Sequence, residues 1–417
     1  MGTDTPPVAR NDGPMNQIVI VGAGHAGFQC AAALRQNGFE GAVLLIGNED
    51  TPPYQRPPLS KAYLQGKIAA TDLGFRPERF FVDQKIDLRK GQVDAIDRPK
   101  RQVLLHDGTA ISYDHLVLAT GSQPRALKVP GAELAGVFAL QTLRDADRLR
   151  AALEGAARAV IIGAGFIGLE FAASARAMGL AVQVVDVAER PMARALSAEC
   201  GAAFTKEHAA QGAELLWKTG VHRLEGEAGQ VTAVVTSDNR RLPADVVLVG
   251  IGAEPRTTLA AQAGLTVENG VVVDANLLSS DPHISAIGDI AAFPQPGIGR
   301  RIRLESVQNA TDQARAVAAR LTGKVAAYEA VPWFWSDQGS LKLQIAGLCS
   351  GSEEHVVLGD PATRSFSVLC IADGVLRAVE TVNRPADHML ARRLLARGAR
   401  VTPAQAREAG FELKALA

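Results

Sequence analysis

The chain has 417 residues, and its 44 lysines and arginines balance its 44 aspartates and glutamates. This length allows two or three domains, each with its own core. A net charge of zero gives no support for a nucleic-acid or membrane-surface partner, so a charged partner would have to be met by a local patch.

The first residues, MGTDTPPVARNDGP, contain no apolar segment of the kind that a secretory signal needs. No later apolar run approaches the roughly 20 residues that span a bilayer. We therefore expect a cytoplasmic protein without a membrane segment, and a disordered tail over residues 1–14.

One motif occurs twice, as QIVIVGAGHAG at residues 17–27 and as RAVIIGAGFIG at residues 158–168. Each copy is a β-branched apolar run, then G-x-G-x-x-G, then a helix-compatible segment, which is typical of a buried parallel strand that leads into a helix. Two copies in this context predict two dinucleotide-binding units. The first glycine of each copy permits a tight turn, the second lets the backbone approach a pyrophosphate, and the third lets the helix pack on its strand. The six glycines are Gly22, Gly24, Gly27, Gly163, Gly165 and Gly168.

The second strand of such a unit ends in an acid that binds the adenosine ribose. In the first unit, AVLLIGNED offers Glu49, with Asn48 as the alternative. In the second unit, LAVQVVDVAER places Asp186 at the expected spacing. A carboxylate there would repel a 2′-phosphate, so NADH is favoured over NADPH. Arg190 lies close enough to soften that preference, unless it is an ordinary surface charge.

The stretch PPYQRPPLSK at residues 52–61 contains four prolines and ends on Lys61. Prolines at this density exclude an ordinary helix interior and stiffen the backbone. The four cysteines of the chain lie elsewhere, at Cys30, Cys200, Cys349 and Cys370, without metal-ligand or C-x-x-C spacing. We therefore expect no metal site and interpret the cysteines as buried small hydrophobic residues.

Two apolar runs that end in glycine, YDHLVLATG and ADVVLVGIG, are each followed by proline and arginine, and we interpret them as the crossings between the two nucleotide-binding domains. The first domain is then expected at 15–122 and 253–325, and the second at 123–252. In DPHISAIGDIAAF, Asp289 ends a strand directly before helix-compatible sequence, where an acid suits a ribityl hydroxyl. Residues 326–417 read as a separate α+β domain with short alternating runs.

The motifs together resemble the FAD-dependent pyridine-nucleotide oxidoreductases of the glutathione-reductase type. More narrowly, RPPLSK, LVLATGSQPR, RLESVQNATDQAR and VPWFWSDQ resemble the ferredoxin reductases of oxygenase systems, the group of putidaredoxin reductase and palustrisredoxin reductase. The resemblance covers residues 16 to about 390. It implies an α/β fold with two Rossmann-like domains, for FAD and NADH, and a C-terminal α+β domain. It also implies an enzyme that passes hydride from NADH to FAD and then single electrons to a 2Fe-2S ferredoxin, which feeds a haem monooxygenase or a Rieske dioxygenase.

The resemblance also assigns roles to individual residues. Disulfide reductases of this fold carry cysteines beside the flavin, whereas RPPLSK has none, so electrons would leave from the flavin itself. Lys61 would lie close to flavin N5 and pair with Glu170. Gln141 and Asn48 depart from the family pattern, which has an arginine and an acid there. Besides the residues already named, the expected FAD contacts are Ala26, Arg56, Val93, Asp289, Val307 and Trp335.

An acidic ferredoxin calls for a basic docking patch near the flavin edge. The candidates are Arg300, Arg301, Arg303, Arg392, Arg393 and Arg397. We expect a monomer or a weak dimer. The alternative functions are a rubredoxin reductase, an NADH oxidoreductase similar to apoptosis-inducing factor, and a non-catalytic sensor that binds FAD and NADH.

Overall fold

The structure is a computed structural model that describes residues 15–296, 298–324, 327–349, 351 and 353–417. The tail expected at residues 1–14 and the domain boundary expected between residues 325 and 326 lie outside the described residues. The chain divides into two compact units. Unit 1 comprises Met1–Gln55, Gly74–Ser122 and Pro255–Ala330, and unit 2 comprises Arg56–Leu73, Gln123–Glu254 and Val331–Ala417.

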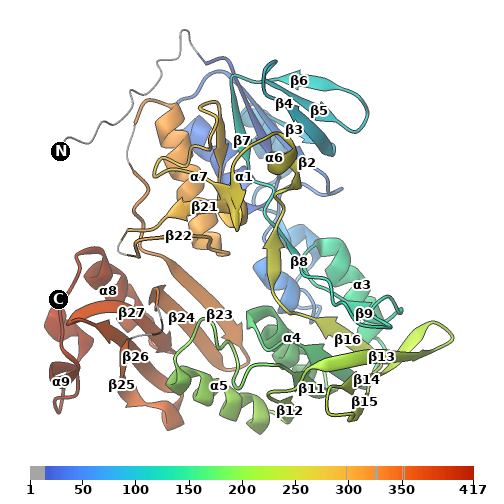
Figure 1. Cartoon of the computed structure of the whole chain (residues 1–417), viewed down its shortest axis with the longest axis vertical. Helices are drawn as coiled ribbons and strands as arrows, with labels where there is room; N and C mark the ends of the chain where they lie inside the picture. The colour runs from blue at the N-terminus through green and yellow to red at the C-terminus, as the bar shows by residue number, and fades with distance from the viewer. Residues whose placement is uncertain (1–14, 297, 325–326, 350, 352) are drawn as a thin grey trace. The chain divides into compact units, whose positions relative to one another are not determined.

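Unit 1 is built on a five-stranded parallel sheet with the strand order β20-β7-β1-β2-β3 (Figure 1). Its strands are β1 (Gln17–Val21), β2 (Ala42–Gly47), β3 (Ile86–Lys90), β7 (His115–Leu118) and β20 (Ile284–Ala286). The central strands are apolar and buried on both faces, as a parallel sheet covered by helices requires. Helix α1 (His25–Gln36) packs against α7 (Val307–Leu321).

Smaller elements complete unit 1. One antiparallel sheet consists of β4 (Val93–Asp97), β5 (Gln102–Leu105) and β6 (Ala110–Ser112). Another sheet consists of β18 (Val267–Glu268), β19 (Gly270–Val272), β21 (Ala291–Pro294) and β22 (Arg301–Ile302). The short helices are α2 (Glu78–Asp83), α6 (Thr258–Gln262) and the 3₁₀ turn η3 (Gly288–Ile290).

The residues after Asp289 correct one expectation. Asp289 does not end a strand, because β20 ends at Ala286 and Asp289 lies within the single turn η3; the next residues form strand β21 instead of a helix. Ala291 and Ala292 pair in parallel with β19, and Phe293 pairs with β22. This pairing with β19 and β22 overrides the helix-compatible local composition.

Unit 2 contains a second five-stranded parallel sheet with the order β12-β11-β10-β16-β9. Its strands are β9 (Val137–Phe138), β10 (Arg158–Ile162), β11 (Ala181–Val185), β12 (Ala213–Leu216) and β16 (Val246–Val249). The helices of this part are α3 (Leu143–Leu153), α4 (Phe166–Ala177) and α5 (Ala198–Ala210), with the 3₁₀ turns η1 (Pro57–Ser60) and η2 (Ala70–Leu73). A three-stranded antiparallel sheet is formed by β13 (Val221–Glu227), β14 (Gln230–Thr236) and β15 (Arg241–Pro243).

The C-terminal part of unit 2 is an antiparallel sheet with the order β23-β24-β27-β26-β25. Its strands are β23 (Trp333–Gln338), β24 (Leu341–Gly347), β25 (Glu354–Asp360), β26 (Ser365–Ala372) and β27 (Val375–Val382). The helices of this part are η4 (Pro361–Thr363), α8 (Pro385–Ala396), α9 (Pro403–Ala406) and η5 (Leu413–Leu416). Strands β8 (Ser122–Pro124) and β17 (Ala253–Pro255), at the expected crossings, pair as a two-stranded sheet.

Two parallel Rossmann-like sheets and a C-terminal antiparallel sheet confirm the expected α/β architecture. Among the helices of the described residues, none combines the length and the hydrophobicity that a transmembrane segment requires.

Candidate functional site

The first glycine motif forms a tight turn between β1 and α1 in unit 1. Gly22 has a φ of +111°, and a Cβ there would lie 2.1 Å from the carbonyl oxygen of Ala119. A Cβ on Gly27 would lie 1.8 Å from the carbonyl oxygen of Gly22, so only glycine lets the helix approach its strand. Gly24 is the N-cap of α1, and a Cβ there would meet no atom within 4 Å. The turn therefore leaves open space beside the helix N-terminus, where amide groups favour an anion.

The second motif repeats this geometry in unit 2. Gly163 has a φ of +106°, a Cβ on Gly168 would lie 2.2 Å from the carbonyl oxygen of Gly163, and Gly165 is the N-cap of α4. Asp186 follows β11 and accepts hydrogen bonds from the backbone N–H of Ala164 at 2.6 Å and of Ala188 at 2.7 Å. The carboxylate thus lies beside the glycine turn, where a ribose acid is expected.

Glu49, the acid of unit 1 that is expected to bind a ribose, has a different partner. Glu49 follows β2 and accepts a hydrogen bond from the Tyr54 hydroxyl at 2.6 Å. The exposed Asn48 donates to Gln92 at 3.2 Å. Glu49 is therefore held in place by a phenol, whereas Asn48 lies on the surface.

The other expected FAD contacts of unit 1 come from four segments. Asp289 lies in η3 and accepts a hydrogen bond from the Ser122 hydroxyl at 2.8 Å. Val307 is the first residue of α7 and is partly buried, and Ala26 is the second residue of α1. The side chain of Val93 belongs to the core, so a ligand contact there falls to its backbone.

In unit 2, the proline stretch ends beside Glu170. Pro57 and Pro58 occupy the first positions of η1, where a missing N–H costs no hydrogen bond. Lys61 follows this turn, and its Nζ lies 2.7 Å from Oε2 of Glu170 on α4. The side chain of Lys61 is 20 % exposed and that of Glu170 is 8 % exposed, so the ion pair is largely shielded from solvent. The geometry brings together the two residues for which the resemblance implied a pair.

Arg56 lies one residue before this turn. Its guanidinium donates to the backbone carbonyl of Gln141 at 2.7 Å. Gln141 provides this contact through its backbone, which any residue type can do. The contact therefore does not depend on the arginine that the family pattern has at this position.

The aromatic residue Trp335 lies on β23 in unit 2 and is partly buried. The Trp335 ring lies 5.6 Å from the ring of Trp333, as expected for alternate residues on one face of a strand. Phe334 points to the opposite face and contacts Phe166 of α4, with ring centroids 4.4 Å apart. Trp335 is therefore part of an aromatic face that α4 does not cover.

The arginines that are candidates for docking a partner differ in their exposure and in the hydrogen bonds that they already make. In unit 1, Arg300 and Arg301 are exposed, whereas the side chain of Arg303 is only 8 % exposed and donates to Glu305 at 2.5 Å and to the Asp289 carbonyl at 3.0 Å. A guanidinium with these partners stabilises the loop around Asp289 and has little capacity left for a protein partner.

In unit 2, the exposed Arg392 lies over the Trp333 ring at 4.8 Å, and Arg397 donates to the Leu416 carbonyl. Arg393 is also exposed. The exposed members of the set are thus better placed to meet a partner than Arg303.

The cysteines follow the expectation except at Cys349. Cys30, Cys200 and Cys370 are buried, whereas Cys349 is exposed in the loop after β24. Donor atoms of Cys349, Cys370 and the buried Glu380 lie within 4.8 Å of one another. Nothing in the spacing of the cysteines indicated this proximity, because the antiparallel sheet brings residues together that are far apart in sequence.

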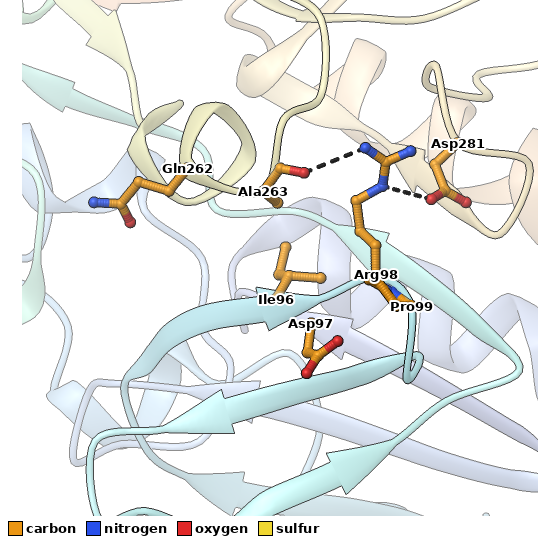
Figure 2. A pocket seen from close by; sticks show the side chains of 7 residues that line it. All are labelled: Ile96, Asp97, Arg98, Pro99, Gln262, Ala263 and Asp281. Carbon is orange, nitrogen blue, oxygen red and sulfur yellow. Dashed lines mark hydrogen bonds and ion pairs between the residues drawn. The ribbon is translucent and has the colours of Figure 1, made fainter.

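An open surface pocket of about 570 Å³ lies in unit 1 (Figure 2). Arg98 spans it, donating to Asp281 at 2.7 Å and to the Ala263 carbonyl at 3.3 Å. None of the residues expected to bind a cofactor lines this pocket. It is therefore separate from the glycine turn of unit 1.

Comparison with known proteins identifies the class that this fold and these motifs define. The sequence matches the pyridine nucleotide-disulphide oxidoreductase family over residues 16–314 and the reductase C-terminal family over residues 333–417. The chain belongs to the pyridine nucleotide-disulphide oxidoreductases.

Individual relatives narrow this class. Rhodocoxin reductase of Rhodococcus erythropolis is 49 % identical over 95 % of this chain and 93 % of its own. The solved ferredoxin reductase for the CYP199A2 system from Rhodopseudomonas palustris is 50 % identical, with a TM-score of 0.94, and the match covers 96 % of this chain and 100 % of that one. The covalent putidaredoxin reductase–putidaredoxin complex matches with 40 % identity and a TM-score of 0.93, over 96 % of this chain and 98 % of that one. These findings confirm the predicted membership of the ferredoxin reductases of oxygenase systems, and the chain is an oxidoreductase of that group.

Proposed function

We propose that this ferredoxin reductase takes hydride from NADH onto bound FAD and passes single electrons to a 2Fe-2S ferredoxin that feeds a haem monooxygenase or a Rieske dioxygenase. The observation that carries the proposal is the cysteine-free turn Pro57–Ser60, which presents Lys61 to Glu170. FAD supplies the redox chemistry when it is bound, because it accepts two electrons together and releases them one at a time. The protein supplies binding, orientation and charge.

The residues of unit 1 fit FAD. The open space at Gly24 and the amides at the start of α1 suit its pyrophosphate. Glu49, held by Tyr54, would accept hydrogen bonds from the adenosine ribose, and Asp289, held by Ser122, would accept them from the ribityl chain. Asn48, Ala26, Val93 and Val307 complete the proposed contacts. The resemblance further assigns Lys61, Arg56 and Trp335 to the flavin half of the cofactor.

Unit 2 is proposed to bind NADH through Gly163, Gly165, Gly168 and Asp186. The Asp186 carboxylate would accept hydrogen bonds from the ribose hydroxyls and repel the 2′-phosphate of NADPH. Arg190 does not oppose this preference, because its guanidinium donates to the carbonyls of Ser197 and Ala193. A guanidinium bound to backbone carbonyls is poorly placed to attract a phosphate.

Lys61 and Glu170 are proposed to act as an orienting and charge-balancing pair. The Lys61 ammonium stabilises negative charge that develops at the flavin ring, and the Glu170 carboxylate fixes the ammonium in place. Neither residue has to act as a general acid or base. The shielded position of the pair strengthens its electrostatic effect compared with a surface ion pair.

We further propose an FAD domain at 15–122 and 253–325, an NADH domain at 123–252 and a C-terminal domain from 326 to 417. An acidic ferredoxin would dock on exposed arginines from the set Arg300, Arg301, Arg392, Arg393 and Arg397. Arg303 would stabilise the nearby loop instead of contacting the ferredoxin directly. The Michaelis constant for the ferredoxin should then rise with salt. A constant that is independent of ionic strength would refute the patch. We propose a cytoplasmic monomer or weak dimer.

The function is tested by mixing the purified protein anaerobically with one equivalent of NADH, and separately of NADPH, in a stopped-flow instrument. We expect the flavin absorbance to bleach with NADH and far more slowly with NADPH. The reduced protein should then reduce a 2Fe-2S ferredoxin much faster than oxygen. A protein that shows no flavin spectrum, even after FAD is added, would refute the proposal. Faster reduction of rubredoxin than of ferredoxin would assign a different acceptor.

A further inference from the structure

The carboxylate of Glu170 has partners besides Lys61. Oε2 accepts hydrogen bonds from the hydroxyl of Ser60 at 2.5 Å and from Nζ of Lys61 at 2.7 Å. Oε1 accepts a hydrogen bond from the Ser336 hydroxyl of β23 at 2.8 Å. A buried carboxylate remains an anion only if such donors replace the water that it has lost. Ser336 therefore donates its hydrogen bond to the carboxylate oxygen that Lys61 does not contact.

The hydrogen bonds continue beyond Ser336 into the interior of unit 2. Nε2 of Gln338 lies 3.1 Å from the Ser336 hydroxyl, and Oε1 of Gln338 lies 2.8 Å from Nε2 of His208 on α5. Ser336, Gln338 and His208 are each at most 1 % exposed. A buried chain of side chains thus connects His208 to the Lys61–Glu170 pair.

The charge of Glu170 fixes the direction of every bond in this chain. A carboxylate only accepts hydrogen bonds, so the single hydroxyl proton of Ser336 must point to Glu170. The Ser336 oxygen is then left to accept, which requires the NH₂ group of Gln338 to face it. The carbonyl oxygen of Gln338 must therefore face His208, and Nε2 of His208 must carry the proton that it donates. Nδ1 of His208 has no hydrogen-bond partner among the described residues.

We propose that Ser336, Gln338 and His208 are positioning residues, which hold the Glu170 carboxylate as an anion and keep its Oε2 oriented toward Lys61. All three donate in the same direction, so their dipoles add at the carboxylate. The consequence for hydride transfer rests on the proposed role of Lys61 and Glu170. The hydrogen-bond direction and the protonation of His208 do not depend on it.

The direction of the chain is tested by the protonated nitrogen of His208, observed by ¹⁵N NMR on histidine-labelled protein. The His208 signal is assigned by its loss in His208→Gln. We expect the Nε2–H form in the wild type. In Glu170→Gln, the new amide should turn its oxygen to Lys61 and its NH₂ to Ser336, which reverses the donors along the chain. The His208 proton should then shift toward Nδ1.

A matched control is Ser367→Ala. Ser367 is also fully buried and also donates to a carboxylate, that of Asp387 at 2.7 Å, but it has no bond to Glu170. This variant should leave His208 in the wild-type form. A wild-type His208 that carries its proton on Nδ1, or a His208 form that is unchanged in both Glu170→Gln and Ser336→Ala, would overturn the proposal.

The effect on the reaction is tested by a double-mutant cycle on the rate of flavin reduction by NADH. Ser336→Ala should slow the reduction about tenfold, the usual effect of losing a hydrogen bond to a charged group. In the Glu170→Gln background the same change should have no further effect, because the carboxylate on which Ser336 acts is gone. An equal slowing in both backgrounds would show a merely structural role for Ser336. A wild type without a flavin spectrum would instead refute the proposed function, and the NMR result would still decide the direction of the chain.

Discussion

Gly24 offers a way to separate cofactor binding from folding with one methyl group. The backbone at this N-cap has φ −81° and ψ −161°, which alanine can adopt, and an added Cβ meets no protein atom within 4 Å. Replacing glycine by alanine at an N-cap costs about 0.5–1 kcal/mol of stability. Gly24→Ala should therefore fold.

The methyl group would, however, occupy the space that we assign to the pyrophosphate of FAD. One lost hydrogen bond between an amide and a phosphate costs roughly 1.5–3 kcal/mol. Since each 1.36 kcal/mol corresponds to a factor of ten, FAD affinity should fall about 10- to 100-fold. Gly27→Ala is the contrasting change, because its Cβ would lie 1.8 Å from the Gly22 carbonyl oxygen, and this variant should misfold.

Gly165→Ala is the matched control in unit 2, where a Cβ comes no closer than 3.8 Å to the Gly250 carbonyl oxygen. It should keep FAD and raise the Michaelis constant for NADH by a similar factor. The assay is titration of the apoprotein with FAD, followed by steady-state kinetics in NADH and a thermal melt of each variant. If Gly24→Ala binds FAD as tightly as the wild type, the assignment of the first motif to FAD is wrong. If Gly165→Ala loses FAD and keeps its NADH kinetics, the two nucleotides are assigned to the wrong units.

Three further predictions concern single side chains. Lys61→Met should keep FAD but slow flavin reduction by NADH at least tenfold in stopped-flow traces, because it removes the cation beside the developing charge; an unchanged rate would place Lys61 outside the reaction. Asp186→Ser should raise the Michaelis constant for NADH and lower the ratio of NADH to NADPH efficiency about tenfold, since it removes the ribose acceptor and the repulsion together; an unchanged ratio would locate the selectivity elsewhere. Burial, with a smaller effect from Arg392, lowers the pKa of His388 from 6.5 to about 4. Between these pH values the unfolded chain binds a proton at His388 that the folded chain does not bind. The free energy of unfolding should therefore fall as the pH drops from 6.5 toward 4. After allowance for solvent screening the loss is about 1–2 kcal/mol, and His388→Gln should flatten the dependence of the melting temperature on pH; an unchanged dependence would contradict this prediction.

Local sequence predicted the parts of the fold that depend on local patterns. The continuous apolar runs before Gly22 and Gly163 became the central strands of the two parallel sheets, because strands buried on both faces need no alternation. The resemblance supplied the pairing of Lys61 with Glu170, which lie 109 positions apart. The catalytic roles of both residues stay predictions.

Other features depend on contacts that local sequence does not contain. The strand after Asp289 forms because β19 and β22 pair with its two edges. The link from Glu170 to His208 requires α4, β23 and α5 to pack together, although Ser336 and Gln338 alternate in sequence. That alternation was a usable signal, since two polar residues at alternate positions of a strand lie on one face and indicate a hydrogen-bonding surface.

The two faces of β23 have different neighbours, and this difference constrains the number of residues in the strand. Trp333 and Trp335 lie on one face, and Ser336 and Gln338 lie on the other, paired with β24 from Trp333 opposite Ala346 to Gln338 opposite Leu341. Inserting or deleting one residue within β23 would exchange the faces of all residues beyond it. If the change falls at the start of the strand, the indoles would be driven against α4 and the Ser336 hydroxyl would turn away from Glu170. A single change of length at the start of the strand would therefore remove both the aromatic face and a hydrogen-bond donor to the Glu170 carboxylate.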